Sequence, residues 1–186
     1  MKIFTKITRA VALMTFVILA FTACDEFAPT MKVPFDSESE FALSPEEAAT
    51  KSTDGHPLLH EWVYSKNINS LIKEKGGNPE KIKEGNIKEV TLTLINENEA
   101  DLSSIISYVE LKVDKNPSVE KVIVARSLEI NQNSITFELI MDDILDYVTG
   151  AEGLTFSLYG DVDNGALEEP LDVKIIVLSE MVVEIL

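Results

Sequence analysis

Apolar residues recur at every second position through most of the chain after residue 32. Successive side chains of a β-strand point to opposite faces, so this spacing predicts strands with one buried face and one solvent-facing face. The segment 119–126 instead has a continuous apolar centre, which is typical of a strand buried on both faces. The pattern predicts about eight strands, over residues 33–43, 58–66, 87–95, 107–113, 119–126, 134–140, 154–160 and 171–186.

Polar turn sequences separate these strands, among them NENEAD, DKNP, NQN and DNG. Asn, Asp, Gly and Pro supply the backbone angles that tight turns need. A bulge or bend is expected at Ser179 and Glu180. Capping or stop residues flank a few apolar ones at four places and predict short helices at 44–47, 69–77, 78–85 and 142–148. We therefore expect an all-β chain that forms a single antiparallel Ig-like β-sandwich of about eight strands with a few short helices.

The first 23 residues differ from the rest of the chain. Lys2, Lys6 and Arg9 supply positive charge without any acid, and residues 10–23 are apolar apart from two Thr. A helix of this length spans about 21 Å, which is short of a hydrocarbon core of ~30 Å. The segment is therefore expected to be a secretory signal peptide rather than a transmembrane anchor. A cytosolic protein with an apolar first helix is the remaining alternative.

Cys24, the only cysteine of the chain, directly follows this apolar run. The stretch Phe21-Thr22-Ala23-Cys24 resembles the lipobox of bacterial lipoprotein precursors, although Phe21 stands where that family usually has Leu. In that family the cysteine thiol receives a diacylglyceryl group, and a dedicated signal peptidase cuts just before the cysteine. The resemblance covers residues 1–24 and implies cleavage between Ala23 and Cys24, with the lipid on Cys24 as the anchor. An ordinary signal peptide followed by a chance cysteine is the alternative.

The chain is thus expected to have three parts, a lipoprotein signal peptide over 1–23, a lipidated tether over 24–31 and a β-sandwich domain over 32–186. Acids such as Asp25 and Glu26 directly after the cysteine resemble an inner-membrane retention signal of enteric bacteria, and also a surface-export signal of Bacteroidota-type lipoproteins. The strand rhythm and the stretch GNIKEVTLTLI resemble small Ig-like β-sandwich lipoproteins of Bacteroidota. We expect a lipid-anchored protein of the cell envelope, with the outer membrane favoured and the membrane face left open.

After residue 23 the chain holds 13 Lys and Arg against 32 Asp and Glu, a net charge of −19. A surface of this charge repels nucleic-acid phosphates and anionic lipid headgroups, so we expect no nucleic-acid partner and no adhesion through a basic patch. Because the acids are spread along a chain of ordinary hydrophobic content, they indicate the solvated surface of a folded domain rather than disorder.

His56 and His60, the only histidines, stand four residues apart and precede Glu61. On a helix this spacing would place metal ligands on one face, whereas on a strand positions four apart are separated by about 13 Å. The surrounding strand pattern therefore favours ordinary loop or surface histidines. Asp161 and Asp163 resemble the start of a calcium loop, but the following Gly and Glu lack EF-hand spacing, and DNG is a hairpin turn signal. We expect no bound metal, with Asp161 and Asp163 as weak candidates for a calcium site.

The sequence contains neither a G-x-S-x-G stretch nor a phosphate-binding Gly-rich loop. His60, Trp62 and Tyr64 are expected to share one strand face, which suits either the core or a platform for a sugar ring. We expect a non-enzymatic, membrane-anchored lipoprotein that has no cofactor and has a binding or structural role, with an envelope protein or a glycan as its partner. The alternative is a carbohydrate- or calcium-binding accessory module of a surface uptake system, which an exposed Trp62 would favour.

Overall fold

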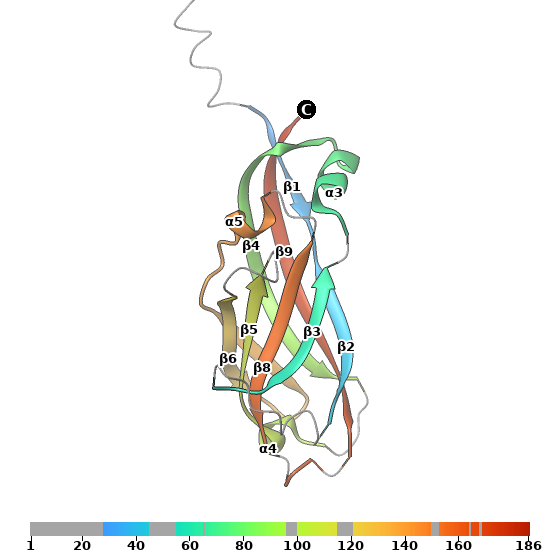
Figure 1. Cartoon of the computed structure of the whole chain (residues 1–186), viewed down its shortest axis with the longest axis vertical. Helices are drawn as coiled ribbons and strands as arrows, with labels where there is room; N and C mark the ends of the chain where they lie inside the picture. Colours follow the sequence, from blue (N-terminus) through green and yellow to red (C-terminus); the bar gives the residue numbers. More distant parts are fainter. Residues whose placement is uncertain are drawn as a thin grey trace, which may run out of the picture.

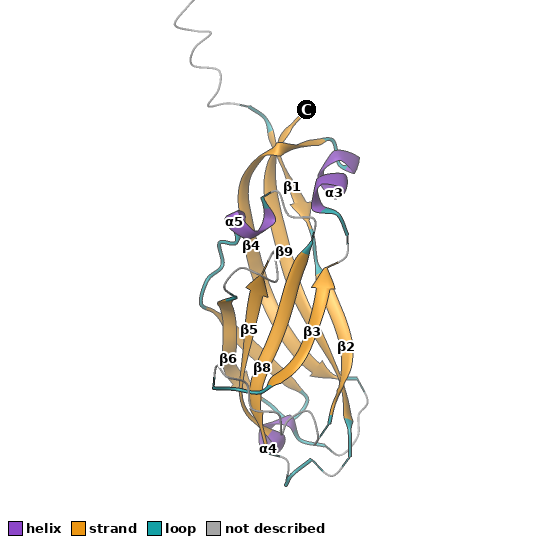
Figure 2. Cartoon of the chain, viewed as in Figure 1, coloured by secondary structure: helices purple, strands orange, loops and turns teal. Residues whose placement is uncertain are grey.

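Most of the residues that the computed structural model describes belong to antiparallel β-strands (Figure 2). The predicted all-β sandwich with a few short helices is therefore confirmed. The structure describes residues 28–44, 55–64, 66–95, 100–114, 121–149, 153–163, 165–167 and 169–186. The predicted signal peptide, Cys24 and most of the helix expected at 44–47 lie outside these ranges.

The described ranges contain nine strands, close to the eight that the alternating pattern predicts. They are β1 (Thr30–Pro34), β2 (Ser37–Leu43), β3 (Leu58–Tyr64), β4 (Gly77–Leu94), β5 (Ile106–Asp114), β6 (Val122–Ile130), β7 (Ser134–Leu139), β8 (Leu154–Val162) and β9 (Leu171–Ile185). The helices are α3 (Ile68–Glu74), α4 (Leu102–Ile105) and α5 (Leu145–Val148). The first strand begins at Thr30, whereas the sequence placed the end of the tether at residue 31.

All strands belong to one antiparallel sheet in the order β1-β9-β4-β7-β6-β5-β8-β3, and β2 also pairs with β9. The sheet curls over its own apolar face, so β8 and β3 cross in front of β4 and β9 (Figure 1). The curl brings β2 and β3 side by side, although β3 ends the strand order and β2 pairs with β9 near its other end. The body is elongated, with the C-terminus and α3 near one end and α4 at the other (Figure 1).

The longest run of alternating burial belongs to β9, in which every second residue from Leu171 to Val183 is buried. One edge of β9 pairs with β2 and then β1, and the other edge pairs with β4. The change from β2 to β1 occurs opposite Ser179, whose carbonyl accepts a hydrogen bond from the Phe35 N–H at 3.0 Å. The bulge or bend expected at Ser179 and Glu180 therefore lies not in β9 but opposite it, at the break between β1 and β2. The strand predicted over 33–43 is accordingly two strands, separated at Phe35 and Asp36.

The helix predicted at 78–85 is wrong, because these residues form the first half of β4. Lys81 and Lys83, two residues apart on the same strand face, both form ion pairs with Glu184 of β9 at 2.8 and 2.7 Å. Gly77 is opposite Ile185 in the same pairing. Pairing with a strand that is distant in sequence therefore overrides the local helical tendency of a Lys- and Glu-rich segment.

Candidate functional site

Side chains join the facing edges of β2 and β3. The Trp62 Nε1–H donates to Ser37 Oγ at 2.8 Å, and Ser39 Oγ is hydrogen-bonded to His60 Nε2 at the same distance. The Phe41 ring stacks on the His60 ring with centroids 4.2 Å apart and planes 5° apart. We call these five residues the β2–β3 seam. Because the strand order contains no pairing between β2 and β3, the seam closes the curled sheet through side chains.

The rings of the seam continue into the core as a stacked series. Trp62 stacks on His60 at a centroid distance of 5.6 Å and on Phe156 of β8 at 5.2 Å. Tyr64, farther along β3, is buried and meets the Phe35 ring edge-on at 6.1 Å. His60, Trp62 and Tyr64 therefore share one face, as predicted, and that face is turned toward the core. The half-buried Trp62 ring has aromatic neighbours stacked on it, which favours its role in the core over a role as a sugar platform.

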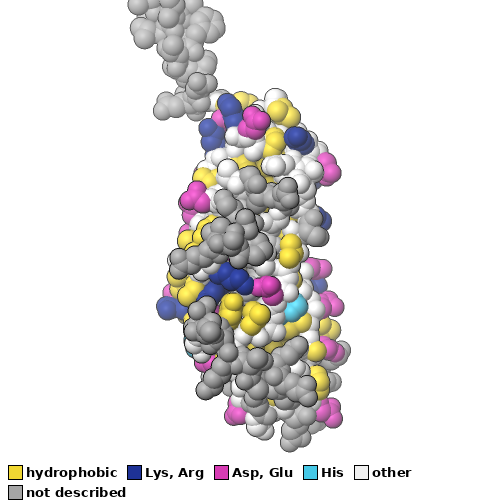
Figure 3. Space-filling view, viewed as in Figure 1, with side chains coloured by type: hydrophobic (Ala, Val, Ile, Leu, Met, Phe, Trp, Pro, Cys, Tyr) yellow, Lys and Arg dark blue, Asp and Glu magenta, His cyan; other side chains and the backbone are white. Residues whose placement is uncertain are grey.

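A polar network lies on the outer face of the sheet across β3, β8 and β5, and we call it the outer network. Lys121 forms an ion pair with Glu61 of β3 and donates to Ser157 Oγ of β8 at 2.9 Å. The Ser157 hydroxyl donates to the same Glu61 carboxylate at 2.8 Å. Figure 3 shows lysine or arginine side chains beside an acidic one near the middle of this face.

The Ser157 hydroxyl lies between a hydrogen-bond donor, Lys121, and an acceptor, Glu61. Partial burial is the largest single influence on the pKa of Lys121 and would lower it, but the interactions with Glu61 and Tyr159 together outweigh burial and raise that pKa. Hydrogen bonds from Lys121 and Ser157 lower the pKa of the Glu61 carboxyl. Lys121 therefore stays protonated at neutral pH and donates to Ser157, whose hydroxyl is fully buried and donates in turn to the Glu61 carboxylate.

The outer network extends along β5 and β8 through aromatic contacts. Lys112 Nζ lies 4.5 Å from the centroid of the Tyr159 ring and 3.1 Å from the Glu110 carboxylate. The Tyr108 hydroxyl donates to the same carboxylate at 2.9 Å. Burial, followed by this hydrogen bond to Glu110, raises the pKa of Tyr108. Lys112 and Glu110 are thus paired within β5, whereas Lys121, the residue before β6, is paired with Glu61 of β3.

The histidines and aspartates singled out in the sequence have separate surroundings. His56 Nδ1 lies 2.9 Å from Asp161 Oδ1, and the His56 ring lies beside Tyr108 rather than beside His60. Asp163 Oδ1 accepts a hydrogen bond from the Gly165 N–H at 2.9 Å, which closes the turn after β8. Among the described residues, no group of three His, Cys, Asp or Glu side chains is arranged to hold a metal ion.

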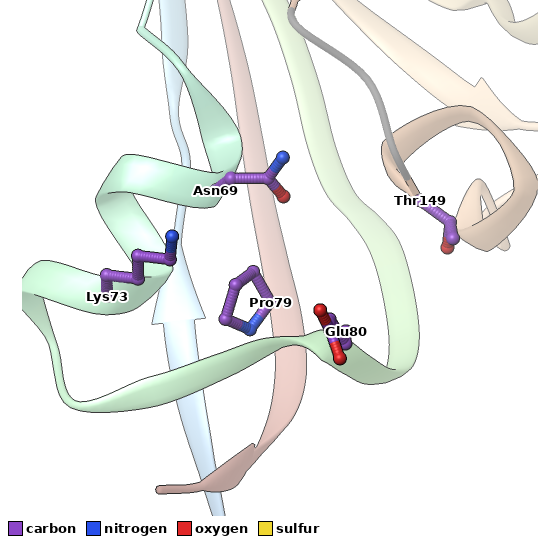
Figure 4. A pocket seen from close by; sticks show the side chains of 5 residues that line it. All are labelled: Asn69, Lys73, Pro79, Glu80 and Thr149. Carbon is purple, nitrogen blue, oxygen red and sulfur yellow. The ribbon is translucent and has the colours of Figure 1, made fainter.

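A pocket lies between α3, the start of β4 and the end of α5 (Figure 4). Its volume is about 330 Å³. The lining residues are Asn69, Lys73, Pro79, Glu80 and Thr149. No sequence pattern predicted this pocket, because its walls come from segments without a shared motif. The outer network was also missed. The available signal was the alternation of Leu154, Phe156 and Leu158, which leaves Ser157 and Tyr159 on the opposite face of β8.

No protein-family model matches the chain, and no curated protein sequence matches it. A structure of turnip yellow mosaic virus is 11% identical, with 86% of this chain and 83% of that chain covered and a TM-score of 0.35. For mud crab tombus-like virus the identity is 8%, the coverages are 85% and 82%, and the TM-score is 0.33. For an Israel acute paralysis virus pentamer these values are 13%, 84%, 91% and 0.35. Likenesses at such TM-scores carry no argument about function.

Within the described ranges, no helix has both the length and the apolar character needed to cross a membrane.

The seam can be tested by removing one hydrogen-bond partner. In Ser37→Ala the Trp62 N–H loses its acceptor, so we expect the free energy of unfolding to fall by about 1–3 kcal/mol. In the Trp62→Phe background the same change should cost much less, because the unsatisfied donor is gone. Urea unfolding of both single variants and the double variant measures this coupling, with Ser70→Ala at an exposed position of α3 as a near-neutral control. Additive effects of the two changes would show that the seam hydrogen bond does not contribute to stability.

The outer network predicts a pH-dependent contribution from Glu61. Its pKa is lowered in the folded state, so the stabilisation is present above the ordinary Glu pKa of 4.5 and is lost as pH falls through the folded pKa. The difference in unfolding free energy between wild type and Glu61→Gln should be ~0.2–1 kcal/mol at pH 7, since the pair is part-exposed, and should approach zero in acid. In a Lys121→Met background this pH dependence should be much weaker. An unchanged dependence there would contradict the assignment.

Proposed function

We propose that the chain is the precursor of a membrane-anchored lipoprotein whose extracytoplasmic β-sandwich has a non-catalytic binding or structural role in the cell envelope. One observation carries the proposal, namely that the only cysteine, Cys24, directly follows an apolar segment and the small residues Thr22 and Ala23. A thiol at this place is what lipidation requires. The two acyl chains of a diacylglyceryl group meet the requirement for stable anchoring, since one chain alone binds only marginally.

The position of the first strand supports this proposal. Cys24 stands six residues before Thr30, where β1 begins. A lipid on Cys24 would therefore hold the folded domain close to the bilayer, because six residues span at most about 20 Å. Asp25 and Glu26 lie within this short connection, and their likeness to lipoprotein sorting signals is the reason for proposing the outer membrane.

The arrangement of polar groups supports a non-catalytic role. Ser157 is buried between a protonated lysine and a carboxylate, and His56 and His60 contact different partners. The alternative of a carbohydrate- or calcium-binding module has less support. Aromatic rings stack on Trp62. Asp161 and Asp163 bind His56 and Gly165 rather than a common centre.

Fractionation of cells that express wild type or Cys24→Ala tests this proposal. We expect wild type in the membrane fraction and labelled by an alkyne fatty acid, because two acyl chains anchor it. We expect Cys24→Ala to lose the label and either to be released or to accumulate uncleaved. Thr22→Ser, which keeps a small residue before the cleavage site, is the matched control and should behave as wild type.

Protease treatment of intact cells then assigns the membrane face. Digestion of wild type on whole cells indicates the cell surface, and protection until the outer membrane is opened indicates the periplasm. Absence of the lipid label from wild type, together with release of the wild-type domain in soluble form, would instead support an ordinary secretory signal peptide and overturn the proposal.

A further inference from the structure

The segments 28–32, 71–84 and 182–186 form one end of the elongated domain, which we call the tether end. The first strand enters here, with Thr30 opposite Glu184, and the Leu186 N–H donates to the carbonyl of Gly76 at 3.1 Å. Figure 1 shows the start of β1, the end of α3 and the C-terminus together at this end. Cys24 is therefore joined to the domain at this end and, through six residues, remains within about 20 Å of it.

The charges of the described residues are divided unevenly between the tether end and the rest of the domain. The tether end has a side-chain charge of +1, from five lysines and four glutamates. The rest of the described residues have six Lys and Arg against 18 Asp and Glu, a charge of −12. The lysines of the tether end are Lys32, Lys73, Lys75, Lys81 and Lys83, and its glutamates are Glu74, Glu80, Glu84 and Glu184. The acidic excess of the domain thus lies away from the tether.

Local contacts hold part of this positive charge in place. Glu184 is buried and is paired with Lys81 and Lys83, whose side chains remain 52% exposed. These two hydrogen bonds lower the pKa of the Glu184 carboxyl. Lys73 and Lys75 are exposed at the end of α3. The tether end therefore presents the ammonium groups of Lys73, Lys75, Lys81 and Lys83 to solvent, together with the exposed carboxylates of Glu74, Glu80 and Glu84.

Exposed apolar side chains lie beside these lysines. Ile185 is 45% exposed and Leu186 is 78% exposed. Lysines next to protruding apolar side chains suit the interface of a bilayer, where ammonium groups meet phosphates and apolar groups reach below the headgroups. Between Cys24 and Met31 the chain has no Lys or Arg, and Asp25 and Glu26 are acidic. Positive charge near the anchor must therefore come from the folded tether end.

The opposite end of the domain has the reverse character. The Asp163 N–H donates to the Ile105 carbonyl at 2.7 Å, which places the acidic turn after β8 beside α4. Asp101, the residue before α4, is nearby, and Asp172 lies at the start of β9. The 15 residues of β9 separate the two ends by about 50 Å. An anionic bilayer would repel this acidic end if the end came close to it. At about 50 Å from the tether end, a distance of several Debye lengths, salt screens that repulsion.

We infer that the tether end rests on anionic phospholipid headgroups of the bilayer that holds Cys24, so that the domain stands upright with its acidic end pointing away from the membrane. The inference rests on the proposed lipid anchor. It also corrects the expectation from net charge alone, since repulsion from anionic headgroups applies to most of the surface but not to this end. The partner is a phospholipid surface, recognised through phosphate oxygens by lysines.

The test measures lysine acetylation, by mass spectrometry, on lipidated protein purified from cells that express the full chain. The protein is reconstituted into vesicles of phosphatidylcholine alone or with 30% phosphatidylglycerol. We expect Lys73, Lys75, Lys81 and Lys83 to react several-fold more slowly on the anionic vesicles, and this protection to disappear in 0.5 M salt. Lys174, which lies away from the tether end, should react equally on both vesicles.

A pair of matched variants identifies the groups responsible. Lys73→Gln with Lys75→Gln should reduce the protection of Lys81 and Lys83, whereas Arg126→Gln with Lys174→Gln should not. Equal acetylation on the two kinds of vesicle would overturn the inference. So would equal protection by inorganic phosphate without vesicles, because the lysines would then bind phosphate rather than a membrane surface.

Failure of the lipid anchor is distinguished from failure of this inference by the mass of the purified protein, which reports lipidation independently of acetylation. If the protein carries no lipid, the single thiol of Cys24 can be coupled to a maleimide-bearing phospholipid, and the acetylation test is made on that conjugate. Protection of the lysines when the conjugate is on anionic vesicles would support the docking surface even though the natural anchor is absent. Lack of this protection would overturn the inference.

Discussion

The pairing of β9 along both of its edges is the constraint on which the rest of the structure depends. Because alternate residues from Leu171 to Val183 are buried, a slip of one residue would expose an apolar face and bury Lys174 and Glu180, so the register is strongly determined. The same register places Thr30 opposite Glu184, which fixes where the tether enters. It also positions β2 so that its side chains meet β3 and close the curled sheet.

The period of two located most strands from the sequence, because alternation is a local property that each strand carries by itself. Where the prediction was wrong, a distant partner decides the structure. Residues 33–43 keep their alternation through the break between β1 and β2, which is set by hydrogen bonds of Phe35 and Asp36 to Ser179. The segment 78–85 has helix-forming lysines and glutamates, and it is a strand because Glu184 and the free edge of β9 hold it.

The candidate sites also divide into those that local sequence predicts and those that depend on partners distant in the chain. Cys24 is identified by local sequence alone, since the proposed processing depends on the residues next to it. The outer network joins Glu61, Lys121 and Ser157, which are far apart in the chain, so only the strand register brings them together. Net charge was also a poor guide to the surface. The value of −19 describes residues 24–186, whereas the fold gathers five lysines, with four glutamates, at the end of the domain that is nearest to Cys24 in the chain.

The proposed role depends on chemistry at one atom, the Sγ of Cys24. The most direct measurement is the mass of the N-terminal peptide of the protein purified from membranes of expressing cells. The account predicts a peptide that begins at Cys24 and carries the added mass of a diacylglyceryl group, with or without a further acyl chain on the amine. A peptide with a free Cys24 thiol, or one that retains residues before Cys24, would contradict it.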